Sequence, residues 1–265
     1  MPYLGIIMEK VTKSQIKLIK SLQQKKYRDE LGLFVAEGDK CVEELRKTFE
    51  LVHLYRAGEN ATRTEIEQMS ALRTPQGTIG VFKKSECSDD FDCSDLILAL
   101  DGIQDPGNLG TIIRTCDWFG VHRLVCSRDT ADCFNPKVVQ ATMGALARVR
   151  VEYVDLPAWL KESKIKNAEL KIYGTLLEGK NMYEVLGDNA QCTMHNAQII
   201  VMGNEGNGIS QAVRQLVTHP IRIPSYPRDG ASGHSGTNEE TSEVIESLNV
   251  SIATAIVLAE FRRIH

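Results

Sequence analysis

Residues 96–126 read LILALDGIQDPGNLGTIIRTCDWFGVHRLVC. The apolar run 96–100 predicts a strand, Pro106, Gly107 and Gly110 shape a turn into a helix, and HRLVC begins another strand. Four further strand candidates alternate with helical stretches: ARVRVEY (147–153), LKIYGTL (170–176), QIIVMG (198–203) and HPIRIP (219–224). This alternation is typical of a parallel sheet flanked by helices, and the continuous apolar runs indicate strands covered on both faces. We therefore predict an α/β fold for this part of the chain.

The amino-terminal part predicts a smaller α/β unit. Residues 12–26 have apolar positions near helical spacing behind a Thr12 or Ser14 cap. Strands and helices are expected after it in the order strand 32–38, helix 39–47, strand 50–55, helix 62–70 and strand 78–82. The acidic segment SECSDDFDCSD (85–95) has the composition of a linker. We expect two domains, 1–88 and 95–265.

The composition is that of an ordinary globular protein, with 42% hydrophobic and 25% charged residues. The sequence contains no run of eighteen apolar residues and no stretch resembling a secretory signal, so we expect a cytoplasmic protein without a membrane partner. The seven cysteines are scattered, odd in number and never spaced as CxxC. This pattern argues against a disulfide framework and against a metal site.

The charge distribution is uneven. The net charge is −4, yet the segment from Lys10 to Arg28 holds seven basic residues and no acidic one. Clustered cations are the usual source of affinity for nucleic-acid phosphates. A solvated helix face explains the same cluster equally well, and charge alone leaves both interpretations open.

Three loops of unusual composition follow predicted strands, and ligands of open α/β sheets bind at the carboxyl ends of strands. The first loop carries Asn108 and leads into a helix with Arg114, which we expect one turn inside the helix and pointing near the loop. The second is MGNEGNGIS (202–210), whose three glycines let a ligand approach the backbone. It lacks the spacing of a phosphate-binding Walker loop and of the dinucleotide motif GxGxxG. Its Glu205 either caps the following helix or anchors a substrate.

The third region is ESLNVSIATAIVLAEF (246–261), which predicts a terminal helix. Ser247 and Asn249 stand at its start, where serine and asparagine are also the preferred capping residues.

Taken together and in this order, the three regions resemble the three motifs of the SpoU (TrmH-like) family of RNA 2'-O-ribose methyltransferases, in the SPOUT superfamily. The residues that carry the likeness are Asn108, Gly110, Arg114 and Gly120, then Gly203, Asn204, Glu205, Gly206 and Gly208, and finally Pro224 with Ser247, Leu248, Asn249 and Val250. The stretch KKYRDELGLFVAEG (25–38) is similar to the substrate-binding domain, with an L30e-like fold, that precedes the catalytic domain in many members.

The resemblance implies a parallel sheet with a carboxyl-terminal trefoil knot, an exception to the usual rule against knotted chains. It also implies a homodimer, with the knot region at the interface and each active site bordered by the partner. S-adenosylmethionine would lie beside Thr175, Gly203, Ile223 and Leu248, held largely by backbone groups.

The resemblance further assigns catalytic roles to Arg114, Asn108, Glu205, Ser247 and Asn249. In the family's proposed mechanism the arginine activates the 2'-hydroxyl. Because a guanidinium keeps its proton to a pH of about 12, we expect Arg114 to orient an RNA phosphate and to stabilise the developing alkoxide electrostatically. The other four side chains would position Arg114, the ribose and the cofactor.

The expected function is therefore the S-adenosylmethionine-dependent methylation of a ribose 2'-hydroxyl in structured RNA, either ribosomal RNA or transfer RNA. The alternatives are a catalytically silent RNA-binding or assembly protein on the same fold and a methyltransferase that acts on a base or small molecule.

One departure from the family is a long insertion between Pro224 and Glu246, which could be a lid, an RNA contact or a tolerated surface loop. Its His234 and Ser235 do not fit the GxSxG pattern of hydrolases.

Overall fold

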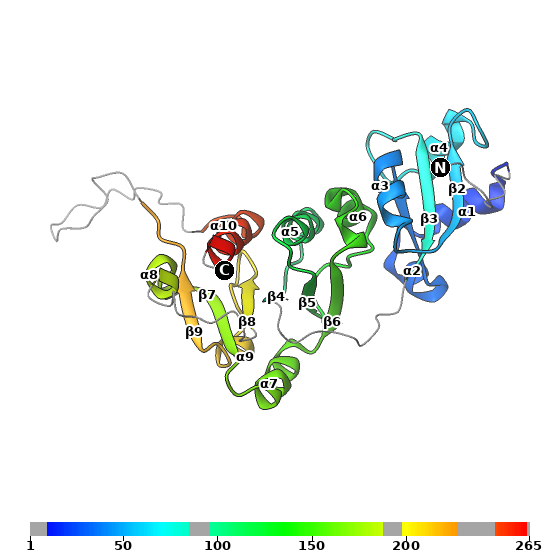
Figure 1. Cartoon of the computed structure of the whole chain (residues 1–265). Coiled ribbons are helices and arrows are strands. Elements are labelled where there is room, and N and C mark those ends of the chain that lie inside the picture. The colour runs from blue at the N-terminus through cyan, green and yellow to red at the C-terminus, as the bar shows by residue number, and fades with distance from the viewer. Residues whose placement is uncertain (1–9, 85–95, 188–197, 227–246, 264–265) are drawn as a thin grey trace, which may run out of the picture.

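The computed structural model describes residues 10–84, 96–187, 198–226 and 247–263. Two sheets organise these residues, one of three strands and one of six. Figure 1 shows the smaller sheet with its helices at one end of the molecule and the larger sheet at the other. The described residues do not include the linker 85–95. They also do not include residues 227–246 of the insertion, which contain His234 and Ser235.

The smaller sheet is antiparallel, with the strand order β1-β3-β2. The expected order of strands and helices after residue 32 is confirmed. The elements of this unit are α1 (Lys13–Ser21), α2 (Lys25–Leu31), β1 (Leu33–Glu37), α3 (Asp39–Leu45), β2 (Leu51–Arg56), α4 (Arg63–Met69) and β3 (Thr78–Lys83).

The prediction of one helix over residues 12–26 was wrong. Thr12 caps α1 as predicted, but α1 ends at Ser21 and α2 begins only at Lys25. The carbonyl groups of Leu22 and Gln23 accept hydrogen bonds from the Arg28 guanidinium, at 2.8 and 2.9 Å. These bonds satisfy carbonyls at the end of α1, where no further helical turn follows. The break between α1 and α2 is therefore accompanied by hydrogen bonds from a side chain to the backbone. The spacing of apolar residues cannot predict such bonds.

The basic cluster of the amino-terminal segment divides into two kinds of residue. Its lysines are exposed in the structure: Lys10, Lys13, Lys17, Lys20, Lys25 and Lys26. Arg28 is instead buried, with 1% of its surface exposed. Only the lysines can therefore meet a large partner at this surface.

The larger sheet has the strand order β6-β5-β4-β8-β7-β9, and every neighbouring pair is parallel. The α/β prediction for this part of the chain is confirmed. Its elements are β4 (Leu96–Asp101), α5 (Pro106–Trp118), β5 (Arg123–Ser127), α6 (Pro136–Thr142), η1 (Ala145–Ala147), β6 (Arg150–Val154), α7 (Leu156–Lys166), β7 (Lys171–Asn181), α8 (Met182–Gly187), β8 (Gln198–Gly203), α9 (Gln211–Arg214), β9 (His219–Arg222) and α10 (Val250–Arg263).

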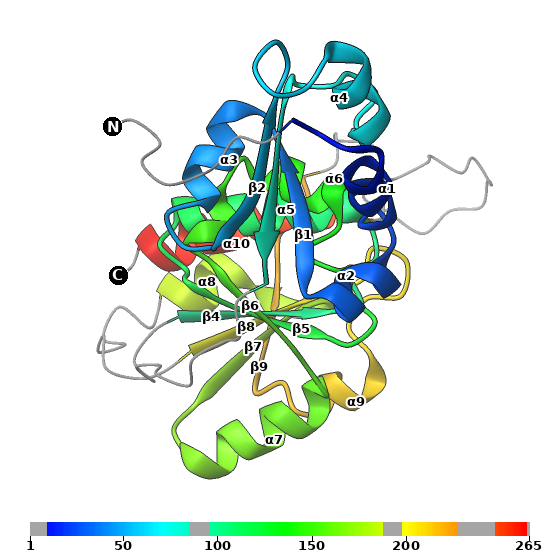
Figure 2. The same ribbon diagram turned by 90° about the vertical axis from the view of Figure 1, so that its right-hand side faces the viewer.

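Helices cover both faces of this sheet (Figure 2), with α5, α6 and α10 on one face and α7 and α9 on the other. Side chains of β4 alternate accordingly: Leu98 and Leu100 belong to the core beneath α5 and α10, and Ile97 and Ala99 to the core beneath α7. Because both faces are buried, the strand reads as one continuous apolar run. None of the helices described here is both long enough and apolar enough to span a membrane.

The strand order determines where a ligand can bind. From β4 the chain continues to β5 and β6 on one side, whereas β8 and β7 lie on the other side. The strand order thus reverses between β4 and β8. Ligands of open α/β sheets bind at such a topological switch point. The register pairs Asp101 with Gly203, so the loops after β4 and β8 start side by side.

Candidate functional site

Three side chains from three distant parts of the chain meet at this switch point. Asn108 Nδ2 and Asn249 Nδ2 each donate a hydrogen bond to Glu205 Oε1, at 2.8 Å. Asn249 Nδ2 also donates to Asn108 Oδ1, at 3.0 Å. The structure therefore brings together one residue from each of the three loops singled out in the sequence, and they form a closed triangle of hydrogen bonds.

Glu205 is the hub of this triangle. Its Oε1 also accepts a hydrogen bond from the backbone amide of Val250, the first residue of α10, at 3.1 Å. Three donors on one oxygen occupy that oxygen, so it serves as an anchor and is a poor acceptor for a substrate proton. Glu205 does not cap the following helix α9, whose cap residue Ser210 instead donates its amide to Asp101 Oδ2 at 2.7 Å.

Asn249 has two functions at once. Its Oδ1 accepts hydrogen bonds from the Ser251 amide, at 3.0 Å, and from the Ser251 hydroxyl, while its Nδ2 reaches Glu205. The helix-cap interpretation and the site interpretation of Asn249 are thus both compatible with the geometry. Because Asn249 and Glu205 are exposed, a bound substrate can reach them.

The loop after β8 is shaped by close backbone approach. A Cβ atom on Gly203 would lie 2.3 Å from the carbonyl carbon of Gly208, which excludes any side chain there. Asn204 ties this loop to the loop after β4 by donating from Nδ2 to the Gly102 carbonyl, at 2.7 Å. The glycines therefore fold the loop back on itself and place Glu205 at its tip.

A cavity of about 820 Å³ opens beside Glu205. All four residues expected near the cofactor line it: Thr175, Gly203, Ile223 and Leu248. Ser247 and Glu205 also line it. Its wall comes from β7, the loop after β8, the end of β9 and the start of α10, so the cavity exists only in the assembled fold.

A second, smaller hollow of about 170 Å³ lies on the other side of Glu205. Its lining includes Asn108, Ile103, Gln104 and Asp105, and it shares Glu205 with the large cavity. Asp105 caps α5 by accepting the Asn108 amide at 2.8 Å. We did not single out Asp105 from the sequence, although an acidic residue directly before proline at a helix start is a recognisable capping signal.

Arg114 lies deeper inside its helix than the sequence suggested. Helix α5 begins at Pro106, so Arg114 lies more than two turns inside it, about 9 Å along the axis from Asn108 and about 120° around it. Arg114 lines neither cavity. It is exposed, and it has no hydrogen bond or ion pair within the described part of the chain. Its guanidinium is therefore free to bind a group from outside this chain.

The described cysteines are buried free thiols: Cys41, Cys116, Cys126 and Cys133. Burial raises the pKa of Cys41 to about 11, so this thiol keeps its proton at neutral pH. No cluster of histidine, cysteine, aspartate and glutamate suited to a metal ion occurs among the residues that the structure describes.

Comparison with known proteins identifies the family. Residues 95–230 match the model of the SpoU rRNA Methylase family, and residues 13–76 match that of the MRM3-like substrate binding domain. The chain belongs to the SpoU family. The resemblance stated from the sequence motifs is thereby confirmed.

Several relatives of this SpoU chain match it over nearly its whole length. The 23S rRNA (guanosine(2553)-2'-O)-methyltransferase RlmP from Bacillus subtilis (strain 168) is 27% identical, over 96% of this chain and 98% of RlmP. A solved Porphyromonas gingivalis structure, assigned to the TrmH family, is 34% identical over 96% of this chain and 98% of its own, with a TM-score of 0.77. The AdoMet-bound rRNA methyltransferase from Sinorhizobium meliloti is 26% identical over 96% of both chains, with a TM-score of 0.74.

Proposed function

We propose that this protein is an S-adenosylmethionine-dependent RNA methyltransferase that acts on a ribose 2'-hydroxyl. The observation that carries the proposal is the bonding of Asn108 and Asn249 to Glu205, which lines a large cavity, in a chain of the SpoU family. RlmP, its relative, is named for the methylation of 23S ribosomal RNA, which favours ribosomal RNA over transfer RNA as the substrate. We also propose that the protein acts in the cytoplasm, which agrees with an RNA substrate.

The large cavity fits S-adenosylmethionine. Its volume of about 820 Å³ falls within the range of roughly 300–1,000 Å³ typical of small-molecule sites. Gly203, Ile223 and Leu248 offer backbone groups and apolar surface to an adenosine, and Thr175 adds a hydroxyl. The Sinorhizobium meliloti relative was solved with AdoMet bound, which supports the same cofactor here. When bound, this cofactor supplies a methyl group carried on a positively charged sulfur.

In the proposed reaction the 2'-oxygen would take this methyl group, the cofactor would leave as a neutral thioether, and the hydroxyl proton would pass to a water molecule. Positioning the oxygen supplies much of the rate of such a displacement. Glu205, Asn108 and Asn249 hold the three loops in register, and Ser247 lies at the cavity wall where it can donate a hydrogen bond. Arg114 holds an RNA phosphate or the developing alkoxide by its charge, because a guanidinium does not release its proton at physiological pH.

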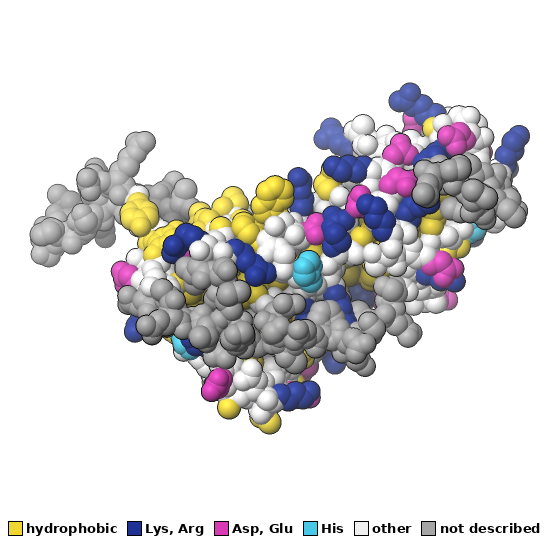
Figure 3. All heavy atoms as spheres, in the orientation of Figure 1, with side chains coloured by type: hydrophobic (Ala, Val, Ile, Leu, Met, Phe, Trp, Pro, Cys, Tyr) yellow, Lys and Arg dark blue, Asp and Glu magenta, His cyan; other side chains and the backbone are white. Residues whose placement is uncertain are grey.

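We also propose the homodimer and the carboxyl-terminal knot that the resemblance implies. Trp118 is 85% exposed and Ile252 is 54% exposed, and they lie on the contacting helices α5 and α10. Figure 3 shows hydrophobic side chains gathered over this region. A second copy covering this surface would place the free Arg114, one helical turn before Trp118, at the border between two subunits. Light scattering of the purified protein tests this assembly, and a monomer would contradict it.

The proposed division of labour assigns RNA binding to domain 1–88 and methyl transfer to domain 95–265. The match of residues 13–76 to a substrate-binding domain supports the first assignment. The exposed lysines of α1 and α2 provide positive charge for phosphates. Structured RNA is recognised largely through its shape and backbone, which suits such a surface.

The deciding experiment maps ribose methylations in total RNA from cells with and without the gene. One methylated position that disappears with the gene, and returns with purified protein and S-adenosylmethionine, would establish the reaction and its site. A synthetic RNA with a 2'-deoxy sugar at that position should accept no methyl group, whereas a base methyltransferase would still act on it. If calorimetry detects no S-adenosylmethionine binding, the catalytically silent alternative is favoured instead.

A further inference from the structure

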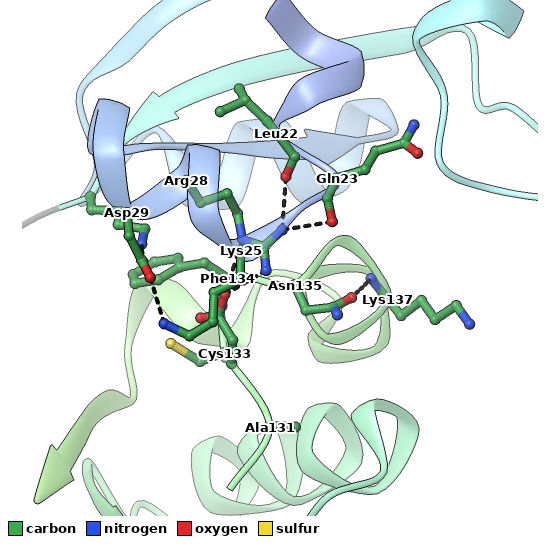
Figure 4. A network of polar contacts seen from close by, with 12 residues as sticks. Leu22, Gln23, Lys25, Arg28, Asp29, Ala131, Cys133, Phe134, Asn135 and Lys137 are labelled. Atoms are coloured by element: carbon green, nitrogen blue, oxygen red, sulfur yellow. Dashed lines mark hydrogen bonds and ion pairs between the residues drawn. The ribbon is translucent and has the colours of Figure 1, made fainter. Parts of the chain in front are cut away.

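A buried ion pair joins the amino-terminal unit to the larger one. Arg28 of α2 donates from Nη2 and Nε to Asp132 Oδ2, at 2.6 and 3.0 Å. The side chains are 2% and 10% exposed. Arg28 Nη1 donates to the carbonyls of Leu22 and Gln23, so the guanidinium links the α1–α2 turn to the loop after β5 (Figure 4).

The loop that Arg28 grips, residues 128–135, has a second anchor on the same unit. The Phe134 ring lies 4.7 Å from the ring of Phe34 and 6.1 Å from that of Phe49, measured between centroids. Lys84 lies over the Phe134 ring at 5.2 Å. The amino-terminal unit therefore holds this loop by an ion pair at Asp132 and by aromatic and cation–π contacts at Phe134.

The same loop supports the loop after β4, which borders the proposed site. Ala131, next to Asp132, donates its amide to the Ile103 carbonyl at 2.8 Å, and Gly102 donates its amide to Ser127 Oγ at 2.8 Å. Asn204, the neighbour of Glu205, is bonded in turn to the Gly102 carbonyl. Only a few bonds thus separate Asp132 from the hydrogen-bond triangle.

We propose that Arg28 is a positioning residue for the methyl-transfer site: by holding Asp132 it fixes loop 128–135, which fixes loop 102–105 beside Glu205. This inference rests on the proposed function. The positioning role explains why Arg28 is buried, whereas the lysines of the same segment are exposed and can contact RNA. Docking of the amino-terminal unit then has a catalytic consequence, because the loop it grips supports loop 102–105, and residues 103–105 line the smaller hollow beside Glu205.

A second contact between the units provides a matched control. Arg148 Nη1 donates to Glu44 Oε2 at 2.7 Å and also pairs with Asp117, away from loop 128–135. Asp132→Asn and Glu44→Gln therefore each change one acid to its amide at an interface between the same two units. Asp132→Asn leaves the buried Arg28 without its counter-charge, and Arg28→Lys keeps a charge but loses the fork of donors.

The first measurement is hydrogen–deuterium exchange of the full-length protein without ligand. We expect faster exchange in peptides covering 102–105 and 128–135 for Asp132→Asn, intermediate exchange for Arg28→Lys, and wild-type exchange for Glu44→Gln. Equal exchange of these peptides in Asp132→Asn and Glu44→Gln would overturn the proposal. Because this readout needs no activity, it decides the coupling even if the protein proves not to be a methyltransferase.

The second measurement is methylation of ribosomal RNA purified from cells that lack the gene, with labelled S-adenosylmethionine. We expect kcat to fall on the order of tenfold in Asp132→Asn, with unchanged KM for RNA, and to stay near wild type in Glu44→Gln. An increase in KM at unchanged kcat would show that Arg28 serves RNA docking alone, and would refute the positioning role.

Discussion

Asn249 Nδ2 lies 2.8 Å from Glu205 Oε1, across 44 residues of sequence. This single bond joins the start of the last helix to the tip of the loop after β8. Because Asn249 Oδ1 also caps α10, the side chain connects the stability of that helix to the geometry of the site.

Replacing Asn249 with aspartate separates these two functions. Aspartate caps a helix as well as asparagine does, so we expect α10 and the melting temperature to change little. The new carboxylate would face Glu205 Oε1, and the like charges should push the two loops apart and lower kcat on the order of 100-fold. Asn249→Ser, which also caps but adds no charge, should retain more activity. A normal kcat for Asn249→Asp in a methylation assay would contradict this role of the triangle.

Arg114→Ala should abolish methylation and leave the fold intact. The side chain is exposed and has no partner among the described residues, so its removal should change the free energy of unfolding by less than about 0.5 kcal/mol. Lys166→Ala on α7, another exposed basic residue, is the control and should keep normal turnover. Turnover and urea unfolding measure the two effects. Near-normal turnover in Arg114→Ala would remove Arg114 from the mechanism.

Gly203→Ala should destroy the cofactor cavity. Its Cβ would lie 2.3 Å from the Ile209 amide nitrogen, so the loop after β8 must move. We expect a loss of about 1–3 kcal/mol in the free energy of unfolding and no measurable binding of S-adenosylmethionine in calorimetry. Gly187→Ala at the end of α8 meets open space and is the control. Equal binding by both variants would show that the loop is not part of the cofactor site.

Reversing two exposed charges should weaken RNA binding selectively. Lys25→Glu with Lys26→Glu changes the α2 surface, and we expect the Kd for RNA to rise about tenfold at low salt, with a smaller salt dependence. The kcat at saturating RNA should be unchanged. Lys166→Glu lies on α7, on the face of the larger sheet opposite α5 and α6. This substitution should leave the Kd for RNA unaffected. Filter binding at several salt concentrations measures this, and an unchanged Kd would assign RNA binding to another surface.

Stability should fall in alkaline solution because the Cys41 thiol loses its proton at a lower pH in the unfolded chain than in the folded one. Burial raises the pKa of Cys41 from 9.0 to about 11, so between these values the unfolded chain binds fewer protons than the folded one. This contribution to stability is present below pH 9 and is lost between pH 9 and about 11, at up to about 1.4 kcal/mol per pH unit. Cys41→Ala should make the fall less steep in urea titrations. An identical slope would show that the Cys41 thiol is not protected.

Local patterns were enough to predict most of the framework. The strands after residue 32 and the parallel arrangement of the larger sheet followed from apolar runs, because a strand buried on both faces leaves a direct mark in the sequence. The three loops that hold Asn108, Glu205 and Asn249 could also be singled out, because glycines and capping residues mark turns at the ends of strands and helices. The resemblance to the SpoU family supplied the catalytic roles expected of these three residues.

What the sequence alone determined is therefore the set of elements and the candidate site residues. Only the tertiary structure decided that Glu205 accepts from Asn249 and Val250, that Arg28 is buried against Asp132, and that Arg114 lines neither cavity. The reason is physical. Periodicity and turn chemistry act between near neighbours, whereas these contacts join residues far apart in the chain, and their partners exist only once the sheet has placed the loops side by side.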